Sequence, residues 1–495
     1  MRKSPPLPAV LCALLAGLAL AAGCHRGRKG EPHPGEKKAD LPDVVLIVVD
    51  TERLDATSLA GGPADVTPAL SRLAADGITF KDAYAPGPWT VPSMYALMTG
   101  LYPSAHGIGF GVVGSKGRLL QPALSPQIDT LAKRLKAAGY ATHAINTNLH
   151  TAARYGLGPG FDTFVGDTFR NLPFPSDEAK KLVPQIAADG RPYFLWIHYF
   201  DPHYPYAPHA PWFARYNTSG IAGFPELMRA YDWRAAGIAP EALMSPGDLP
   251  LAARLELFAV LRDQLAAGDD AATRVLAFLR AAYLSEIAYT DRAVGELLAS
   301  LPRPDDTVVI YVSDHGEELF EHGLFTHKQP GGHLFDELLR VPFVVRLPHR
   351  EQAGRVIDSP VSLVDVLPTV LDLIGQPVPG GLGGRSLVPL LRHEPLPERA
   401  LFAETTFDKE TSRAVLRPPW KLVRYGSDGR LALYDTATDP GERTDLAAAE
   451  PERTRALAAE LDAFVARTHP VHPPVPLPAP SADELARLRA LGYSD

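Results

Sequence analysis

Residue types that bind metal ions follow two separate apolar runs of this sequence. Asp50 comes directly after residues 43–49, a run rich in valine and isoleucine, and Asp314 and His315 come after residues 307–312 and one serine. In open α/β sheets, ligands bind beyond the carboxyl ends of the strands. A single aspartate there is more often a cap or turn residue, and a histidine in an Asp-His-Gly turn can simply bond to its own loop. Two unrelated strands that both end in metal-ligand residue types indicate a metal site more strongly than either does alone.

Thr90 lies in the most informative segment of the chain. Residues 88–100 read PWTVPSMYALMTG. They resemble the active-site signature of the sulfatase-like branch of the alkaline phosphatase superfamily, which reads Cys/Ser-x-Pro-x-Arg and whose first residue is oxidised to formylglycine, the nucleophile. Thr90 occupies that first position, and Met94 occupies the position of the arginine. The resemblance extends over residues 42–470 and implies a sulfatase-like fold.

The residue types present exclude formylglycine. The sequence contains two cysteines, Cys12 and Cys24, and both precede the predicted catalytic body. That body therefore has no disulfide, no thiolate metal ligand and no cysteine to convert. Oxidising Thr90 in the manner of a serine-type site would give a ketone rather than an aldehyde, so no formylglycine is expected.

The resemblance implies one metal site made of Asp50, Thr90, Asp314 and His315. Sulfatases usually have Asp-Asp at the first of these places and Asp-Asn at the last, whereas this chain has Thr51 after Asp50 and His315 after Asp314. Exchanging two oxygen ligands for a threonine and an imidazole disfavours Ca²⁺. Mn²⁺ and Zn²⁺ accept mixed oxygen and nitrogen ligands and are favoured, with Mg²⁺ and Ca²⁺ as alternatives. The arrangement resembles the lipoteichoic acid synthase and phosphoethanolamine transferase group, in which a metal-bound threonine is the nucleophile.

Thr90 is expected to be such a nucleophile. A threonine hydroxyl reacts poorly at its ordinary pKa, and metal coordination stabilises the alkoxide. The predicted reaction is in-line attack on phosphorus, giving a phospho-threonine that water or a second alcohol displaces. A formylglycine hydrate releases sulfate by returning to the aldehyde, a route that Thr90 lacks, so phospho esters are favoured over sulfate esters. The alternative interpretation of Thr90 is a packed β-branched residue at the start of a helix, with no catalytic role.

Most of the remaining predicted catalytic and substrate-binding residues are histidines. His203 lies in the segment HYFDPHYPY, and the resemblance aligns it with a histidine that contacts the ester group or the leaving oxygen. A histidine can donate a proton to that oxygen near neutral pH. His198, in the same segment, is a weaker substrate-binding candidate, and a satisfied core residue is the alternative interpretation.

A second cluster of basic residues lies at residues 321–333. Relatives place a histidine or lysine here against the substrate anion, so His327 and Lys328 are the preferred catalytic candidates. His333 is a weaker candidate because a Pro-Gly-Gly segment lengthens the loop before it, and a solvated charged loop is the alternative. His150 is another weak substrate-binding candidate, from a loop that replaces a Lys-x-His motif of many sulfatases.

Alternating strands and helices must position these residues. Apolar, β-branched runs predict buried strands at residues 43–49, 193–197, 307–312 and 341–345. Thr67-Pro68 predicts a helix start, and residues 272–301 predict a long amphipathic helix. The expected fold class is α/β, resembling alkaline phosphatase and sulfatases: a mostly parallel central sheet flanked by helices, with a small antiparallel C-terminal subdomain.

Composition limits the classes of partner. The chain has 495 residues, 46% of them hydrophobic and 21% charged, which is typical of a globular protein with a large core. Its net charge of −8 offers no basic surface for nucleic acid, which is therefore not an expected partner.

The N-terminus predicts export. Residues 1–23 combine a basic start with an apolar stretch too short for a confident membrane span, and LAAGC at its end resembles a bacterial lipobox with Cys24 as the lipidated residue. An ordinary secretory signal or an uncleaved anchor is the alternative. Residues 24–42 predict a flexible tether. Because no aspartate follows Cys24, a lipoprotein of the outer membrane is favoured, in the periplasm or at the cell surface.

The predicted domains follow from these segments. A catalytic domain is expected at residues 43–398, with an insertion at 204–270, and a C-terminal subdomain with a tail at 399–495. Three functions remain open. The first is a lipid-anchored, metal-dependent phosphodiesterase or transferase of envelope or extracellular phospho esters. The second is a sulfate ester hydrolase that works without formylglycine, and the third is a catalytically inactive binding lipoprotein of the same fold.

Overall fold

The computed structural model of the chain describes residues 41–108, 112–113, 119–223, 225–227, 251–327, 333–407, 410–426 and 428–477. The predicted signal peptide, the predicted lipidation site Cys24 and nearly all of the predicted tether lie outside these residues. Among the helices that the structure describes, none is long and apolar enough to cross a membrane.

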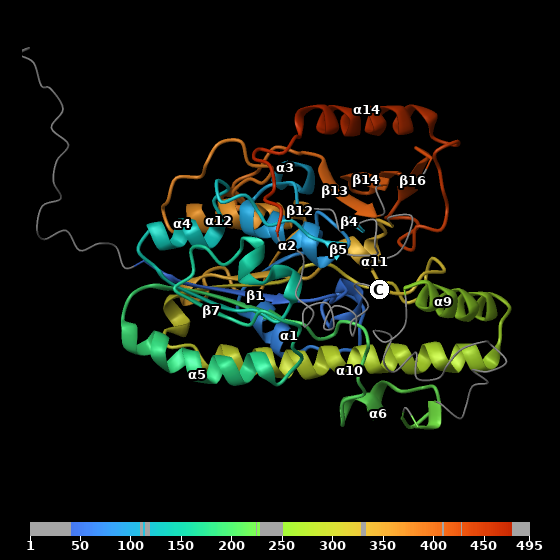
Figure 1. Cartoon of the computed structure of the whole chain (residues 1–495), viewed down its shortest axis with the longest axis horizontal. Coiled ribbons are helices and arrows are strands. Elements are labelled where there is room, and N and C mark those ends of the chain that lie inside the picture. The colour runs from blue at the N-terminus through green and yellow to red at the C-terminus, as the bar shows by residue number, and fades with distance from the viewer. Residues whose placement is uncertain are drawn as a thin grey trace, which may run out of the picture. The chain divides into compact units, whose positions relative to one another are not determined.

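An eight-stranded, mostly parallel sheet forms the centre of the fold (Figure 1). In spatial order its strands are β11 Arg355–Ile357, β2 Ile78–Phe80, β10 Phe343–Arg346, β9 Thr307–Ser313, β1 Asp43–Val49, β8 Tyr193–Tyr199, β6 Ala141–Ile145 and β7 Thr163–Val165. β10 runs antiparallel to β9 and β2, and the other neighbouring pairs are parallel. The four predicted strands are confirmed as β1, β8, β9 and β10.

Helices cover both faces of this sheet, which explains the unbroken apolar runs of its central strands. All seven residues of β1 are buried. Val45, Ile47 and Val49 project to one face, where they join a core with α1 Pro68–Ala75, α5 Phe174–Asp189 and α10 Asp270–Ser300. The other face carries α2 Thr90–Thr99, α4 Leu131–Ala137 and α12 Val366–Leu373 (Figure 1). The predicted helices at Pro68 and at 272–301 are confirmed as α1 and α10.

A second, antiparallel sheet follows in the chain, as predicted. Its strands pair in sequence order: β13 Leu401–Phe407, β14 Glu410–Arg417, β15 Trp420–Arg424 and β16 Leu431–Asp435. α14 Pro451–Arg467 packs on one face through Leu457, Leu461 and Phe464. The opposite face contacts Leu334, Phe335 and Leu339, which lie close to the end of β9 in the fold.

The region predicted as an insertion contains helices that pack on α10. α6 Trp212–Tyr216 and α9 Leu251–Ala266 both contact α10 in the structure. Residues 228–250 lie outside the described part of the chain. Short elements complete the description: β3 Ala83–Tyr84, α3 Pro103–His106, β4 Val112–Val113, β5 Leu119–Leu120, α11 Asp336–Leu339, β12 Val361–Ser362 and α13 Val388–Leu391.

Candidate active site

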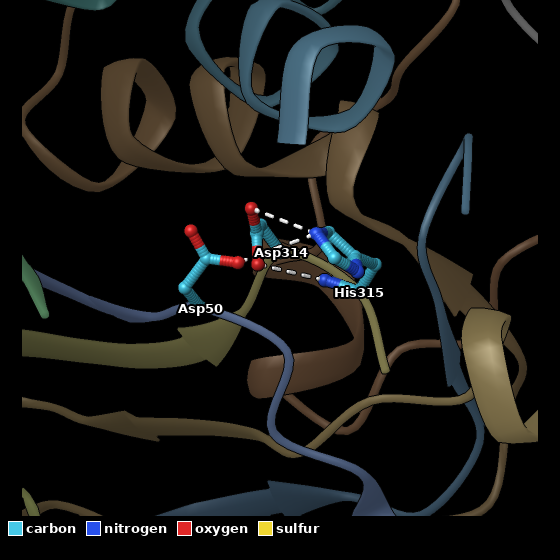
Figure 2. A group of neighbouring side chains, drawn as sticks. All are labelled: Asp50, Asp314 and His315. Atoms are coloured by element: carbon cyan, nitrogen blue, oxygen red, sulfur yellow. Dashed lines mark hydrogen bonds and ion pairs between the residues drawn. The ribbon is translucent and has the colours of Figure 1, made fainter. Parts of the chain in front are cut away.

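Asp50 and Asp314 lie side by side at the carboxyl edge of the central sheet. β1 and β9 are parallel neighbours in which Val49 pairs with Ser313. The next residues of the two strands, Asp50 and Asp314, therefore lie next to each other at the edge of the sheet. His315 comes next on the β9 side. Asp50, Asp314 and His315 are fully buried, and each offers a ligand atom within 4.8 Å of the other two (Figure 2).

The donor atoms of these three residues fit a divalent cation. His315 Nε2 lies 3.4 Å from Asp50 Oδ1 and 3.6 Å from Asp314 Oδ2. Within the described chain, both of these carboxylate oxygens are without a hydrogen bond. His315 Nδ1 donates to the carbonyl of Gly316 at 2.8 Å, which directs the Nε2 lone pair towards the carboxylates. Buried carboxylate oxygens beside an imidazole lone pair are a ligand set for Mn²⁺ or Zn²⁺.

The electrostatics of the cluster agree with this fit. Burial raises the pKa of Asp314 to about 8, and the adjacent Asp50 carboxylate adds to the shift. Burial would also raise the pKa of Asp50, but the adjacent His315 ring, with His203 and His198 nearby, holds it below its usual range. Burial opposes the protonation of His315, yet Asp314 and Asp50 raise its pKa to about 9. A divalent cation would offset both carboxylates and displace these protons.

Thr90 lies against this cluster at the first residue of α2. Its Oγ1 is 3.5 Å from Asp50 Oδ2 and 3.4 Å from His315 Nε2. The N-terminal end of a helix favours negative charge, both on a developing alkoxide and on an approaching anion. Met94, one turn further along α2, is fully buried and brings no positive charge to the site. The structure therefore brings Thr90 together with the other three predicted metal ligands.

Thr51 has a strained backbone beside the cluster. Its φ of 57° is unusual for a β-branched residue. Its amide donates to Asp314 Oδ1 at 3.3 Å, and Tyr283 donates its hydroxyl to the Thr51 carbonyl at 2.7 Å. Strain of this kind concentrates at functional sites, where surrounding contacts enforce it. Here the strained conformation of Thr51 places its amide within hydrogen-bonding distance of Asp314 Oδ1.

Asn148 is a site residue that the sequence did not reveal. It follows β6, whose carboxyl end lies at the same edge of the sheet, and it is fully buried. Its Nδ2 donates to Asp50 Oδ2 at 2.9 Å and lies 3.4 Å from Thr90 Oγ1. The position after a parallel strand was an available signal, but an asparagine two residues before His150 carries no motif of its own.

Two of the predicted histidines extend the cluster. His198, at the end of β8, places Nε2 3.6 Å from Asp50 Oδ2, while its Nδ1 lies 3.0 Å from Thr147 Oγ1. The His203 ring stacks on Phe200 at 4.4 Å between centroids. Burial lowers the pKa of His198 and of His203 to about 4, so both rings are neutral at pH 7.

His327 joins the predicted residues through ring contacts. Its ring centroid lies 4.4 Å from that of His315 and 4.9 Å from that of His203. His327 Nδ1 is 2.7 Å from Glu317 Oε1, a fully buried carboxyl that the sequence also did not reveal. A carboxylate bonded to one ring nitrogen fixes the ring and favours its protonated form. Glu317 therefore positions His327.

The remaining candidates lie elsewhere or are not described. His150 Nδ1 lies 2.8 Å from Gln121 Oε1, and its ring contacts Trp89 and Phe169 rather than the carboxylates. His333 lies beside Glu318, with 3.9 Å between Nδ1 and Oε1, and its ring contacts Phe335 and, in the C-terminal part, Tyr425. The structure thus gives neither residue a described contact with Asp50 or Thr90. The candidate Lys328 and the lipidation site Cys24 lie outside the described residues.

Comparison with known families gives two matches. The family model described as Sulfatase matches residues 42–376. A second model, described as N-sulphoglucosamine sulphohydrolase, C-terminal, matches residues 320–468. Together they span the central sheet, the candidate site and the antiparallel sheet. A curated protein named sulfatase, from Formosa agariphila, is 27% identical over 84% of this chain and 85% of its own length.

Solved structures with two different kinds of substrate share this fold. One is a structure solved with its substrate D-glucosamine-2-N,6-O-disulfate, with a TM-score of 0.65 and 21% identity over 86% of this chain and 97% of that one. The other is the phosphonate monoester hydrolase of Agrobacterium radiobacter, with a TM-score of 0.65 and 22% identity over 86% of this chain and 96% of that one. The two similarities are equal, so the fold does not discriminate between sulfur and phosphorus esters.

Proposed function

The chain belongs to the sulfatase family of ester hydrolases, and from this premise we propose that it cleaves or transfers phospho esters with Thr90 as the nucleophile. The observation that carries the proposal is the position of Thr90 Oγ1, within 3.5 Å of Asp50 Oδ2 and 3.4 Å of His315 Nε2 at the start of α2. Phosphorus is preferred as the reacting atom because Thr90, unlike formylglycine, has no return to an aldehyde by which to release sulfate.

A divalent metal held by Asp50, Asp314, His315 and Thr90 would lower the pKa of the Thr90 hydroxyl and offset charge on the ester oxygens. Asp50 Oδ2 accepts the Thr90 hydroxyl hydrogen at 3.5 Å and so orients Oγ1. As the bond from Oγ1 to phosphorus forms and the bond from phosphorus to the leaving oxygen breaks, the proton of the Thr90 hydroxyl passes to Asp50 Oδ2.

Protons for the leaving group come from the histidines of this chain. In this proposal His327, which Glu317 holds through Nδ1, donates a proton to the leaving oxygen, and the neutral His203 ring packs beside it. Water or an acceptor alcohol then displaces Thr90 from phosphorus: the proton of that nucleophile passes to His327, and the proton on Asp50 returns to Thr90 Oγ1. Each half-reaction therefore regenerates the group that the other uses.

The experiment compares four p-nitrophenyl esters with the full chain and its Thr90→Ala and Thr90→Ser variants: phosphate, bis-phosphate, phenylphosphonate and sulfate. Removing a nucleophile costs on the order of 10³-fold or more in kcat, so Thr90→Ala should lose turnover of the phospho esters while Thr90→Ser keeps part of it. Thr99→Ala, at the other end of α2, serves as the matched control. Chelation should abolish activity, and Mn²⁺ or Zn²⁺ should restore it.

Hydrolysis of sulfate esters is the second candidate function. It is favoured by the name of the Formosa agariphila relative and by the sulfated sugar bound in one similar structure. Thr90-dependent release of p-nitrophenol from the sulfate alone would establish it and refute the phospho-ester proposal. If none of the four esters turned over while metal remained bound, an acceptor-dependent transferase would be tested next by adding an alcohol acceptor.

We also propose that the protein is exported and anchored to a membrane through a lipid on Cys24, with envelope or extracellular esters as its substrates. The support is the basic and apolar start of the sequence and its LAAGC segment. Labelled palmitate should be incorporated into the full chain and not into Cys24→Ala. A Cys24→Ala protein labelled as strongly as the wild type would refute the anchor.

A further inference from the structure

The turn after β1, residues 50–53, is held by contacts from several parts of the fold. Its four backbone amides donate to four different acceptors: Asp50 N to the Tyr199 carbonyl at 2.9 Å, Thr51 N to Asp314 Oδ1 at 3.3 Å, Glu52 N to Ser313 Oγ at 3.0 Å, and Arg53 N to the Tyr283 hydroxyl at 3.0 Å. Three of these acceptors lie in β8 or β9 or directly after β9. The fourth, Tyr283, comes from the long helix α10.

The strained residue of this turn, Thr51, is not held by its own side chain. Its φ of 57° places a β-branched residue in the left-handed region, which costs conformational energy. Its Oγ1 is buried and makes no hydrogen bond among the described residues. Its backbone carbonyl, in contrast, accepts from the Tyr283 hydroxyl at 2.7 Å. Because the same hydroxyl oxygen accepts from the Arg53 amide, Tyr283 bridges the two sides of the turn.

The fold fixes the position of Tyr283. Its side chain is 1% exposed and belongs to a core cluster that also contains Phe278 and Phe325. The centroid of its ring lies 5.2 Å from that of Tyr206. Burial raises the pKa of Tyr283 well above its usual range, so the hydroxyl keeps the hydrogen that it donates to Thr51.

The amide of Thr51 acts on a candidate metal ligand. Asp314 Oδ1 accepts from the Thr51 amide at 3.3 Å and from the His315 amide at 2.9 Å. These two donors orient the carboxylate, whose Oδ2 lies 3.6 Å from His315 Nε2 and has no hydrogen bond among the described residues. A relaxed Thr51, with negative φ, would turn its amide away from Oδ1. The orientation of Asp314 therefore depends on the strained backbone of Thr51.

We propose that Tyr283 is a positioning residue for the metal site: its hydroxyl holds Thr51 in the strained conformation, and the Thr51 amide in turn orients Asp314 towards the ion. The inference rests on the metal site proposed above and goes further by naming what holds its ligands in place. Tyr283 acts through the backbone of Thr51 and supplies no ligand itself. Without its hydroxyl, the Thr51 carbonyl and the Arg53 amide lose their partner, so the turn relaxes and the ion binds more weakly.

The affinity of the full chain for Mn²⁺ or Zn²⁺, measured by chelator competition, tests the proposal independently of activity. Tyr283→Phe removes one hydroxyl and should weaken binding by about 10–100-fold. Tyr140→Phe is the matched control. Tyr140 is equally buried and donates to the Pro42 carbonyl at 2.8 Å, before β1 rather than after it, so this variant should bind as the wild type does.

A glycine at position 51 separates positioning from a general loss of packing. Glycine adopts a positive φ without strain, so it does not need the tyrosine hydroxyl to remain in that conformation. In the Thr51→Gly background, Tyr283→Phe should therefore lose most of its effect on metal affinity. An equal loss of affinity in both backgrounds would overturn the proposal, because the hydroxyl would then support the site by a route other than the strain on Thr51.

A further variant tests the part that the Thr51 backbone plays. Thr51→Val keeps the branched shape and the amide but lacks the hydroxyl, so it should bind the ion as the wild type does. Weaker binding would overturn the proposal, and this arm stands even if Tyr283→Phe fails to fold.

Circular dichroism and thermal unfolding of the metal-free proteins establish which variants are folded. A wild type that binds no ion would refute the proposed metal site and this inference with it. A wild type that binds an ion, together with a folded Tyr283→Phe of equal affinity, would overturn this inference alone.

Discussion

At the scale of single residues, Asp50 is the carboxylate that the other polar side chains of the candidate site share as a neighbour. One of its oxygens faces His315, and the other accepts from Asn148 and from Thr90. The orientation of this proposed metal ligand therefore depends on an amide that follows a strand two places away in the sheet. Hydrogen-bond donors that hold a ligand side chain orient it, and removing them commonly changes metal affinity.

Asn148→Ala should therefore weaken metal binding by about 10–100-fold, because Asp50 loses its only amide donor of this type among the described residues. Titration of the apo protein with Mn²⁺ or Zn²⁺ in a chelator buffer measures the change. Asn217→Ala, in the segment after α6, is the control and should bind as the wild type does. Equal affinities for Asn148→Ala and the wild type would contradict the prediction.

The residues that the sequence identified share a property. Asp50, Asp314 and His315 directly follow strands that unbroken apolar runs make recognisable, and Thr90 lies in a segment with a family resemblance. Asn148 follows β6, whose sequence ATHAI is not an unbroken apolar run, and Glu317 comes after the Asp-His-Gly turn rather than directly after β9, so neither stood out in the sequence. The direction of a side chain in a loop depends on backbone torsions and distant contacts, which no local pattern specifies. Tertiary structure alone shows that Asn148 points at Asp50.

At the scale of elements, α2 sets the position of Thr90, the proposed nucleophile. α2 ends at Gly100, whose φ of 69° allows the chain to turn away. Its first turn is held by His106, at the end of α3. His106 Nδ1 accepts from the Ile108 amide at 3.0 Å, so Nε2 carries the hydrogen and lies 3.3 Å from the Pro92 carbonyl. A neutral imidazole therefore links α3 to the helix of Thr90.

Acid should weaken this link. Burial lowers the pKa of His106 to about 3. The unfolded chain binds a proton at this residue below about pH 6.5, whereas the folded chain does so only near pH 3, so stability falls as the pH decreases through that window. The slope from this one group is at most about 1.4 kcal/mol per pH unit.

His106→Asn should reduce that acid dependence while lowering the free energy of unfolding at pH 7. Denaturant unfolding of both proteins between pH 4 and pH 7 measures the difference in slope. His349→Asn, at an exposed position, should keep the wild-type slope. A variant at position 106 with the same slope as the wild type would show that the imidazole titrates normally in the fold.

At the scale of the whole molecule, the antiparallel sheet completes the core around α2. Ala96 and Tyr102, in and after α2, share one cluster with Phe402 and with Phe464 of α14. The Phe402 and Phe464 rings stack at 4.0 Å. The sequence indicated the sheet through its resemblance but not α14, whose apolar face becomes evident only when it covers the strands.

A chain ending after residue 398 should consequently fail to fold, because it exposes the apolar surface that the sheet and α14 cover. Expression with a chain ending after residue 477 as the comparison tests this through soluble yield, circular dichroism and thermal unfolding. The longer chain should unfold cooperatively near the wild-type temperature. A soluble, cooperatively unfolding chain of 398 residues would show that the first part is an independent domain.

The place of β1 between β8 and β9 has a consequence for biosynthesis. Thr51 and Asp314 bond to each other although they are 263 positions apart in the chain. During translation the ribosome releases β1 long before its partner strands exist, and long-range pairing of this kind forms late and slowly. The candidate cation site therefore cannot form until the chain has been extended beyond His315, so a nascent chain shorter than that contains its first carboxylate without the partner residues that would share an ion.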